Sequence, residues 1–343
     1  MTPWLLLLFG LVSAALAYNV HRPGAARGYT LIPRFLLGWW ASELAAHGLA
    51  VQIAVTATLV VYGALAAPAG WVGLALMLAS WWGLYTAFQL GRSSRAVIRA
   101  VLDRGLGSDP AGDADEREHV HAPLPLFPLI MPLWLWDRAV ERIGDLPYGD
   151  DHRRQRLDIY RARAGVTRAP VVLQIHGGAW IIGNKRQQGM PLVLHLAARG
   201  FVCVSINYRL SPRATFPDHI VDVKRAIAWI REHIAEYGGD PDFIVITGGS
   251  AGGHLAALAA LSADDPEFQP GFEDIDTAVR ACVPFYGVFD FTHGIGPSDR
   301  MSLRRLLERR VMKRSRDDDP DLFRRASPIH RALEQAPPFL VIH

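Results

Sequence analysis

The sequence predicts an α/β protein with a mostly parallel sheet, preceded by about three transmembrane helices. Half of the 343 residues are hydrophobic, and the apolar excess lies before residue 91. After residue 157, short continuous apolar runs alternate with segments of helical character, which is typical of parallel strands covered by helices on both faces. We expect transmembrane helices over 1–91, a linker that can include a membrane-surface or cap segment over 92–140, and the α/β domain over 141–343.

The N-terminal region contains three apolar stretches, which run over 4–18, 49–67 and 71–90. The last two lack charged residues, and each is close to the roughly 20 apolar residues that cross a bilayer. They predict a helical hairpin with residues 68–70 as its turn. We favour an uncleaved span for the first stretch, because no basic residue precedes it as in a signal peptide, although 15–17 resembles a cleavage site.

The arginines near these stretches fall on one side of the predicted spans. They are Arg22, Arg27, Arg34, Arg92, Arg95, Arg99 and Arg104. Basic loops stay in the cytoplasm by the positive-inside rule. The sequence therefore predicts a multi-pass membrane protein whose catalytic domain faces the cytoplasm.

Composition argues against several classes of function. The formal charge of +3 is too small to indicate nucleic-acid binding. Cys203 and Cys282 lie in apolar runs, so we expect two buried thiols and neither a disulfide framework nor a metal site. No cofactor is expected, and the oligomeric state is not predicted.

The α/β domain is expected to hold six strands. They are RLDIYRA (156–162), PVVLQIH (170–176), FVCVSINY (201–208), FIVITG (243–248), ACVPFYG (281–287) and the final PFLVIH (338–343). Helices are expected over about 217–237 and after Ser250. No internal repeat is visible.

Ser250 is the candidate nucleophile. Gly248, Ser250 and Gly252 fit the pattern GxSxG, and the pattern stands between a predicted strand and a predicted helix. A strained turn there would expose the hydroxyl at the helix N-terminus. The alternative is a glycine-rich turn that binds phosphate or only packs.

A second glycine-rich stretch follows an earlier strand. It comprises His176, Gly177, Gly178 and Ala179. Acyl transfer places negative charge on a carbonyl oxygen, and exposed backbone amides of such a loop can stabilise that charge. The stretch is a candidate oxyanion hole.

Longer sequence motifs support a family resemblance. The stretches HGGAWIIG, NYRLSP, HIAEYGGDPDFI, GGSAGGH and VPFYGVFDFT resemble the α/β-hydrolases of the hormone-sensitive-lipase-like esterase group. They are similar in particular to isoprenylcysteine methylesterases and to membrane-associated actinobacterial lipase/esterase proteins.

The resemblance implies roles for the motif residues. It makes Ser250 the nucleophile and forms the oxyanion hole from the amides of Gly178, Ala179 and Ala251. Ala179 replaces the third glycine of the commoner HGGG form, and its methyl group would narrow the alcohol side of the pocket. His176 is expected to brace the loop rather than act as a base, and Gly177, Gly248 and Gly252 support the two turns.

The other histidines have less definite roles. His254 stands four residues after Ser250 and is expected to support the strained turn at that serine, the elbow. For His219 and His233, in the helix over 217–237, we expect solvation or capping.

The acid and base of a triad are expected beyond residue 343, because in this fold they follow the serine in the order acid, then histidine. The chain would then be a truncated reading of a longer enzyme that lacks the C-terminal part of its domain. Asp290 is the alternative acid. His293 and His330 fall in a predicted cap segment, whose charge-dense part over 300–325 is expected to form an amphipathic helix.

These observations predict a membrane-anchored serine carboxylesterase or lipase-like enzyme. It would form an acyl-enzyme at Ser250 and act on a small or lipid-like ester. An amidase or a prenylcysteine methylesterase would share all these parts. The alternative from another class is a catalytically inactive, membrane-tethered binding module.

Overall fold

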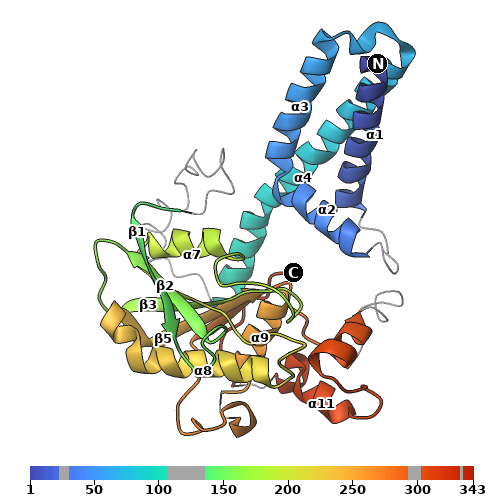
Figure 1. Ribbon diagram of the computed structural model, residues 1–343. Helices are drawn as coiled ribbons and strands as arrows, with labels where there is room; N and C mark the ends of the chain where they lie inside the picture. Colours follow the sequence, from blue (N-terminus) through green and yellow to red (C-terminus); the bar gives the residue numbers. More distant parts are fainter. Residues whose placement is uncertain (23–30, 107–135, 264, 293–302, 333–334) are drawn as a thin grey trace. The chain divides into compact units, whose positions relative to one another are not determined.

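The computed structural model describes residues 1–22, 31–106, 136–263, 265–292, 303–332 and 335–343. The chain divides into two compact units, Met1–Pro132 and Leu133–His343 (Figure 1). His293 and residues 107–135 of the expected linker lie outside the described residues.

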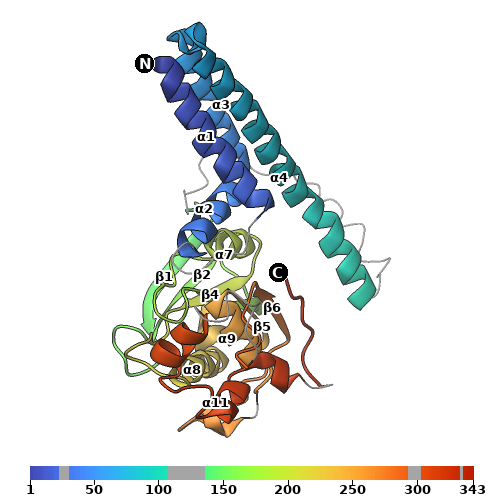
Figure 2. The same cartoon turned by 90° about the vertical axis from the view of Figure 1, so that its right-hand side faces the viewer.

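The first unit is helical. Its elements are α1 (Thr2–His21), α2 (Leu31–Glu43), α3 (Ala45–Val61), the short 3-10 helix η2 (Ala64–Ala66) and α4 (Pro68–Leu106). Figures 1 and 2 both show α1, α3 and α4 packed side by side, with α2 crossing one end of α3.

Two of these helices, α1 and α4, are long and apolar enough to cross a membrane. A third span results only if the end of α2 and α3, which meet at an angle of 91°, are counted as one. The structure therefore supports two spans clearly, fewer than the expected three.

The predicted hairpin turn is wrong in position. Pro68 begins α4, and the chain turns over 62–67, where Gly63 adopts a left-handed conformation (φ 80°). Proline suits the first turn of a helix because its missing N–H would have no partner there. At its other end α4 continues to Leu106, through residues that were expected to belong to the linker.

Small residues allow α1 and α4 to approach closely. A Cβ at Gly73 would lie 2.7 Å from the backbone of Leu6, and one at Gly10 would lie 2.7 Å from the Gly73 carbonyl oxygen. The buried Ser80 hydroxyl hydrogen-bonds both the Ser13 carbonyl (3.0 Å) and the Gln52 side-chain oxygen (3.0 Å). Close backbone contact and internal hydrogen bonds are the interactions that join helices in an apolar solvent.

The second unit contains a six-stranded sheet in the order β1-β2-β4-β3-β5-β6. The strands are β1 (Val140–Pro147), β2 (Arg156–Ala162), β3 (Ala169–Ile175), β4 (Val202–Ile206), β5 (Gly239–Gly249) and β6 (Ala281–Phe285). Strands β4, β3, β5 and β6 are parallel, and β1 and β2 are antiparallel additions at one edge. Beyond β6, Phe339 and Ile342 form isolated parallel bridges.

Helices cover both faces of this sheet, as expected. α7 (Met190–Ala197) packs on one face with Tyr160, Val172 and Cys203. α8 (Asp218–His233), the 3-10 helix η3 (Ile234–Tyr237) and α9 (Ala251–Ala260) pack on the other (Figure 1). Cys203 and Cys282 are both free and buried in the sheet, as predicted.

Two parts of this unit differ from the sequence-based expectation. β1 was not foreseen, because its side chains are mostly exposed and its apolar pattern is weak. The charge-dense segment is not one helix. In its described part, a π-helical turn η5 (Leu307–Val311) is followed by the separate helix α11 (Pro320–Arg325). Asp319 caps α11 by accepting a hydrogen bond from the Leu322 amide (3.1 Å).

We predict that Gly73→Ala destabilises the first unit, since the new methyl group would press on the backbone of Leu6. Overpacking of this kind costs about 1–3 kcal/mol. Gly91→Ala is the matched control on the same helix, because a Cβ there meets no atom within 4 Å. Thermal melting of the full chain in detergent micelles should show a lower midpoint for Gly73→Ala alone. Equal midpoints for the two variants would contradict the close α1–α4 contact.

Candidate active site

Parallel pairing of β3 with β5 brings the two glycine-rich motifs together. Ile175 is paired with Gly248, so both strands end at the same level of the sheet. The chain after β3 enters the loop 176–183, and the chain after β5 turns at Ser250 into α9. Motifs separated by about seventy residues of sequence therefore meet at the carboxyl edge.

Ser250 occupies a strained turn. Its φ of 55° and ψ of −118° are unfavourable for a residue with a side chain, at a cost of about 1–3 kcal/mol. The Ser250 amide donates to the Phe285 carbonyl (2.9 Å), which fixes the turn against β6. The hydroxyl does not cap α9, and it makes no hydrogen bond to another described residue.

Glycines make this turn possible. A Cβ at Gly252 would lie 2.2 Å from the Ile175 carbonyl oxygen, and one at Gly248 would lie 2.6 Å from the same atom. Side chains cannot be accommodated at such distances. The two outer glycines of the serine motif therefore serve close packing of the elbow on β3.

The loop after β3 has an unusual run of positive φ angles: 117° at Gly178, 53° at Ala179 and 59° at Trp180. It lies against the elbow, since a Cβ at Gly177 would be 3.3 Å from the Ser250 Cβ. Within the described residues, the amides of Gly178, Ala179 and Ala251 donate no hydrogen bond. Three unused donors thus lie on the two turns that flank the serine, as an oxyanion hole requires.

His176 is enclosed behind this loop. Its Nδ1 donates to the Gly177 carbonyl (2.7 Å), and its ring stacks on Tyr208 at 4.5 Å between centroids. Tyr208 in turn donates its hydroxyl to the His176 carbonyl (3.1 Å). Burial lowers the pKa of His176 to about 4. These contacts are those of a neutral residue that shapes the loop.

His254 joins α9, the helix after the elbow, to the loop 176–183, here called the oxyanion loop. Its Nδ1 accepts a hydrogen bond from the Trp180 indole (3.2 Å), and its Nε2 donates to the Ala326 carbonyl (2.8 Å). The ring also stacks on Phe291 at 4.5 Å. Both ring nitrogens are engaged, and burial lowers the pKa of His254 to about 4. The geometry agrees with the predicted supporting role.

The expectation for His219 is wrong. It is fully buried, and its Nε2 lies 3.1 Å from the Ser211 hydroxyl. Burial lowers its pKa to about 3. The α8 face that carries His219 packs on the sheet, so solvation was the wrong interpretation. His233, on the last turn of α8, is partly exposed beside Glu232 and Glu236, as expected.

Three supporting residues were missed by sequence reasoning. Gln188 accepts a hydrogen bond from the Gly177 amide (2.8 Å), and Tyr208 stacks beneath His176. A Cβ at Gly249 would lie 2.7 Å from the Tyr286 hydroxyl, so that ring covers the elbow. Tyr208 and Tyr286 lie within the quoted NYRLSP and VPFYGVFDFT stretches, which offered a signal, whereas Gln188 stands in a polar turn without one.

Asp290, the alternative acid, is used in a local turn. Its Oδ1 accepts hydrogen bonds from the Thr292 amide (2.7 Å) and hydroxyl (2.6 Å). The Thr292 hydroxyl also contacts the His330 Nε2 (3.1 Å). His343 ends the chain next to the bridge between Phe285 and Ile342. No hydrogen bond joins these groups to Ser250 in the part of the chain that the structure describes.

The arrangement can hold an ester carbonyl between a nucleophile and three amides. It has the electrostatics of acyl transfer, because the N-terminus of α9 and the free N–H groups all favour negative charge. Among the described residues, no group of histidine, cysteine and carboxylate side chains could bind a metal ion. Within the described residues, no general base is hydrogen-bonded to the Ser250 hydroxyl.

The chain is similar to known ester hydrolases. The BD-FAE family model matches residues 157–343. The chain is 44% identical to the probable carboxylic ester hydrolase LipM of Mycobacterium tuberculosis, over 98% of this chain and 78% of LipM. It is 39% identical to a probable isoprenylcysteine α-carbonyl methylesterase of Oryza sativa subsp. japonica, over 48% of this chain and 38% of that protein. The predicted family resemblance is confirmed.

A solved structure shares the fold. A truncated form of a carbohydrate esterase from gut microbiota superposes with a TM-score of 0.53 and 29% identity, over 59% of this chain and 76% of that one.

Three buried neutral histidines predict an acid-sensitive domain. The folded pKa values of His176 and His254 are about 4 and that of His219 is about 3, all below the ordinary 6.5. Protonation therefore favours the unfolded chain, and stability is lost as pH falls from about 6.5 towards 4. The slope approaches about 1.4 kcal/mol per pH unit for each histidine.

This dependence can be measured as melting midpoints of the full chain between pH 7.5 and 5. His219→Gln should reduce the loss of stability at low pH, whereas the exposed His152→Gln controls for removal of any histidine. Parallel curves for all three proteins would show that His219 is not the buried neutral group described.

Proposed function

This chain belongs to the BD-FAE family of carboxylic ester hydrolases, and from that premise we propose that it is a serine carboxylesterase that works through an acyl-enzyme at Ser250. One observation carries the proposal. Ser250 has a strained backbone just before α9, and its hydroxyl makes no hydrogen bond to another described residue. Three amides that donate no hydrogen bond within the described residues flank it. Strain and unused donors both favour function over packing, because a purely structural turn would have neither.

In the proposed mechanism the Ser250 oxygen attacks the ester carbonyl. The amides of Gly178, Ala179 and Ala251 stabilise the oxyanion, the alcohol leaves, and water releases the acid from the acyl-enzyme. Donors fixed before the reaction are worth about 3–4 kcal/mol each in such sites. The methyl group of Ala179 borders the hole and would restrict bulky alcohols.

A serine hydroxyl needs a general base, and the three buried histidines among the described residues of this unit do not qualify. His254 uses both ring nitrogens, His176 donates to its own loop, and His219 contacts Ser211. Their contacts support a role in holding the site open and rigid. The proton acceptor therefore has to be a group other than these three.

We also propose that the first unit anchors the enzyme in a membrane as a multi-pass bundle of α1, α3 and the first part of α4. The support is the length and apolar character of α1 and α4 and their close, internally hydrogen-bonded contact. Arg22 and Arg34 follow α1, and the exposed arginines of α4 follow its apolar part. By the positive-inside rule, the hydrolase unit would lie in the cytoplasm.

We predict that a fluorophosphonate probe labels Ser250 and that Ser250→Ala abolishes labelling together with esterase activity. The loss in rate should be at least about 10³-fold, since removal of the nucleophile leaves only the oxyanion hole. Ser94→Ala, an exposed serine on α4, is the control and should keep both. A folded chain that hydrolyses esters while Ser250 stays unlabelled would refute the mechanism.

The membrane topology predicts where reporters work. A reporter active only in the cytoplasm should be active when fused after residue 120 and inactive when inserted in the turn over 62–67. An export-dependent reporter should show the reverse pattern. Activity of the export-dependent reporter after residue 120 would place the hydrolase unit on the opposite side.

A further inference from the structure

A cavity of about 610 Å³ lies on the hydrolase unit beside the oxyanion loop. Its wall combines the segment before β2, the loop after β4, the start of α8 and Ile181. β2 is antiparallel to β4, so its first residues lie at the carboxyl edge of the parallel strands. The charged lining residues are Asp151, Arg153, Arg154, Arg209, Arg213 and Asp218.

The two carboxylates that line this cavity already have ion-pair or hydrogen-bond partners. Asp218 pairs with Arg209 (3.2 Å), whose guanidinium also contacts the buried Asp222 (2.7 Å). Asp151 accepts hydrogen bonds from the backbone amides of Arg153 (2.9 Å) and Arg154 (2.8 Å). Arg209 is therefore neutralised, and neither lining carboxylate contacts the other guanidinium groups.

Three arginines remain without an ion pair in the described part of the chain: Arg153, Arg154 and Arg213. Arg154 is the most enclosed of them, and it donates to the Gly183 carbonyl (3.0 Å). Burial and the neighbouring charge of Arg153 lower the pKa of Arg154, as expected for positive charge that lacks a partner. The cavity thus has an excess of positive charge.

This charge lies next to the catalytic loop. Gly183, whose carbonyl binds Arg154, is so close to His176 that a Cβ would be 2.3 Å from its Nδ1. Ile181, in the cavity wall, donates its amide to the Gly178 carbonyl (3.0 Å). Gly177, between these residues and the elbow, packs on Ser250. One short loop therefore connects the cavity with the nucleophile.

We propose that this cavity binds a carboxylate or phosphate group carried by the ester substrate, so that the enzyme favours anionic over neutral esters. The inference rests on the proposed esterase function and adds its substrate class. Guanidinium groups pair with planar carboxylate and with phosphate oxygens through two parallel hydrogen bonds. Arg153 and Arg213 are exposed at the cavity and Arg154 is half-buried, so an anionic group can reach them from solvent.

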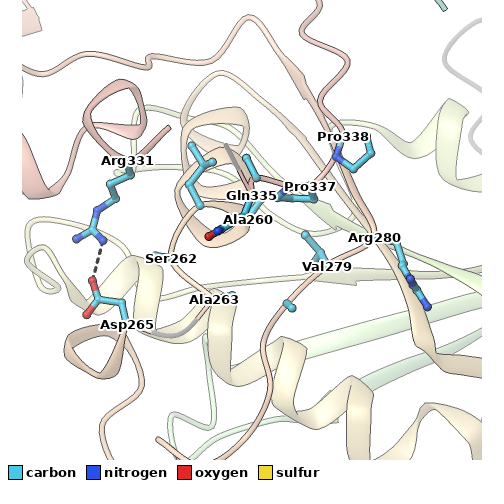
Figure 3. A pocket seen from close by; sticks show the side chains of 13 residues that line it. Ala260, Ser262, Ala263, Asp265, Val279, Arg280, Arg331, Gln335, Pro337 and Pro338 are labelled. Carbon is cyan, nitrogen blue, oxygen red and sulfur yellow. Dashed lines mark hydrogen bonds and ion pairs between the residues drawn. The ribbon is translucent and has the colours of Figure 1, made fainter. Parts of the chain in front are cut away.

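A second cavity of this unit provides a contrast and a control. It has a volume of about 580 Å³ and lies at the amino edge of the strands, beyond the end of α9 (Figure 3). Its Arg331 is paired with Asp265 (2.7 Å), and its Arg280 donates to the Asp242 carbonyl (3.1 Å). Arg280→Gln removes one arginine charge at the opposite edge of the sheet.

The first experiment measures anion binding without catalysis. Adipate is titrated calorimetrically into the full chain carrying Ser250→Ala, in detergent micelles at constant ionic strength. The added pair Arg153→Gln and Arg213→Gln should weaken adipate binding by about tenfold or more, the effect of losing a charge-assisted hydrogen bond. Arg280→Gln should leave binding unchanged. Equal binding in all variants, or none in the parent, would overturn the site.

The second experiment measures substrate preference. The full chain should show a higher kcat/KM for mono-p-nitrophenyl adipate than for p-nitrophenyl hexanoate, and Arg153→Gln with Arg213→Gln should remove the difference mainly through KM. Equal effects on the two esters would overturn the substrate class. Absence of all hydrolysis with intact adipate binding would refute the esterase function and leave the anion site standing.

A lipid could supply the same chemistry as a soluble ester. Lysophosphatidic acid, tested beside mono-p-nitrophenyl adipate, distinguishes the sources. Arginine-dependent cleavage of the lipid alone would assign the anionic group to a lipid headgroup, and arginine-dependent cleavage of the adipate ester alone would assign it to a soluble acid. Arginine-independent cleavage of both would contradict the proposal.

Discussion

The active site depends on the hydrogen-bonded register between β3 and β5. With Ile175 opposite Gly248, the two central strands end together, and the loops that follow them are forced into contact. A shift of one strand by one residue would turn its buried side chains to the opposite face of the sheet, where other helices pack, so the core protects the register. The geometry of the candidate site thus follows from packing that the domain needs for stability.

Conformational strain at the site is held in place by buried polar contacts. Ala179, Trp180 and Ser250 all have positive φ, each at a cost in free energy. The indole of Trp180 is fixed to His254, and the carbonyl of His176 is fixed by Tyr208. These contacts use neutral histidines because a charged imidazole would lose too much hydration energy at such depth. The rigidity of the loop and its sensitivity to acid have the same origin.

Much of the hydrolase unit could be predicted from sequence, since its central strands are continuous apolar runs and its turns require glycine. Both signals are local. β1 escaped because a half-exposed edge strand has little apolar pattern. The burial of His219 was missed because it depends on which face of α8 meets the sheet. The arginine cavity was invisible for a related reason: its residues come from three separate segments, and ion pairing decides which charges remain free.

The elbow helix α9 has no solvent-exposed side, as all ten of its residues are buried. Loops that carry catalytic groups usually open and close independently of the core, with low local free energies of opening. Ser250 cannot, because moving it means extracting a whole buried helix from its place on the sheet beside α8. The hydrogen-bonded amides of Ser250 and α9 should be among the slowest to exchange with solvent deuterium. Heat should inactivate the enzyme only when the entire domain melts. We therefore expect Ser250 to belong to the most stable cooperative unit of the hydrolase domain.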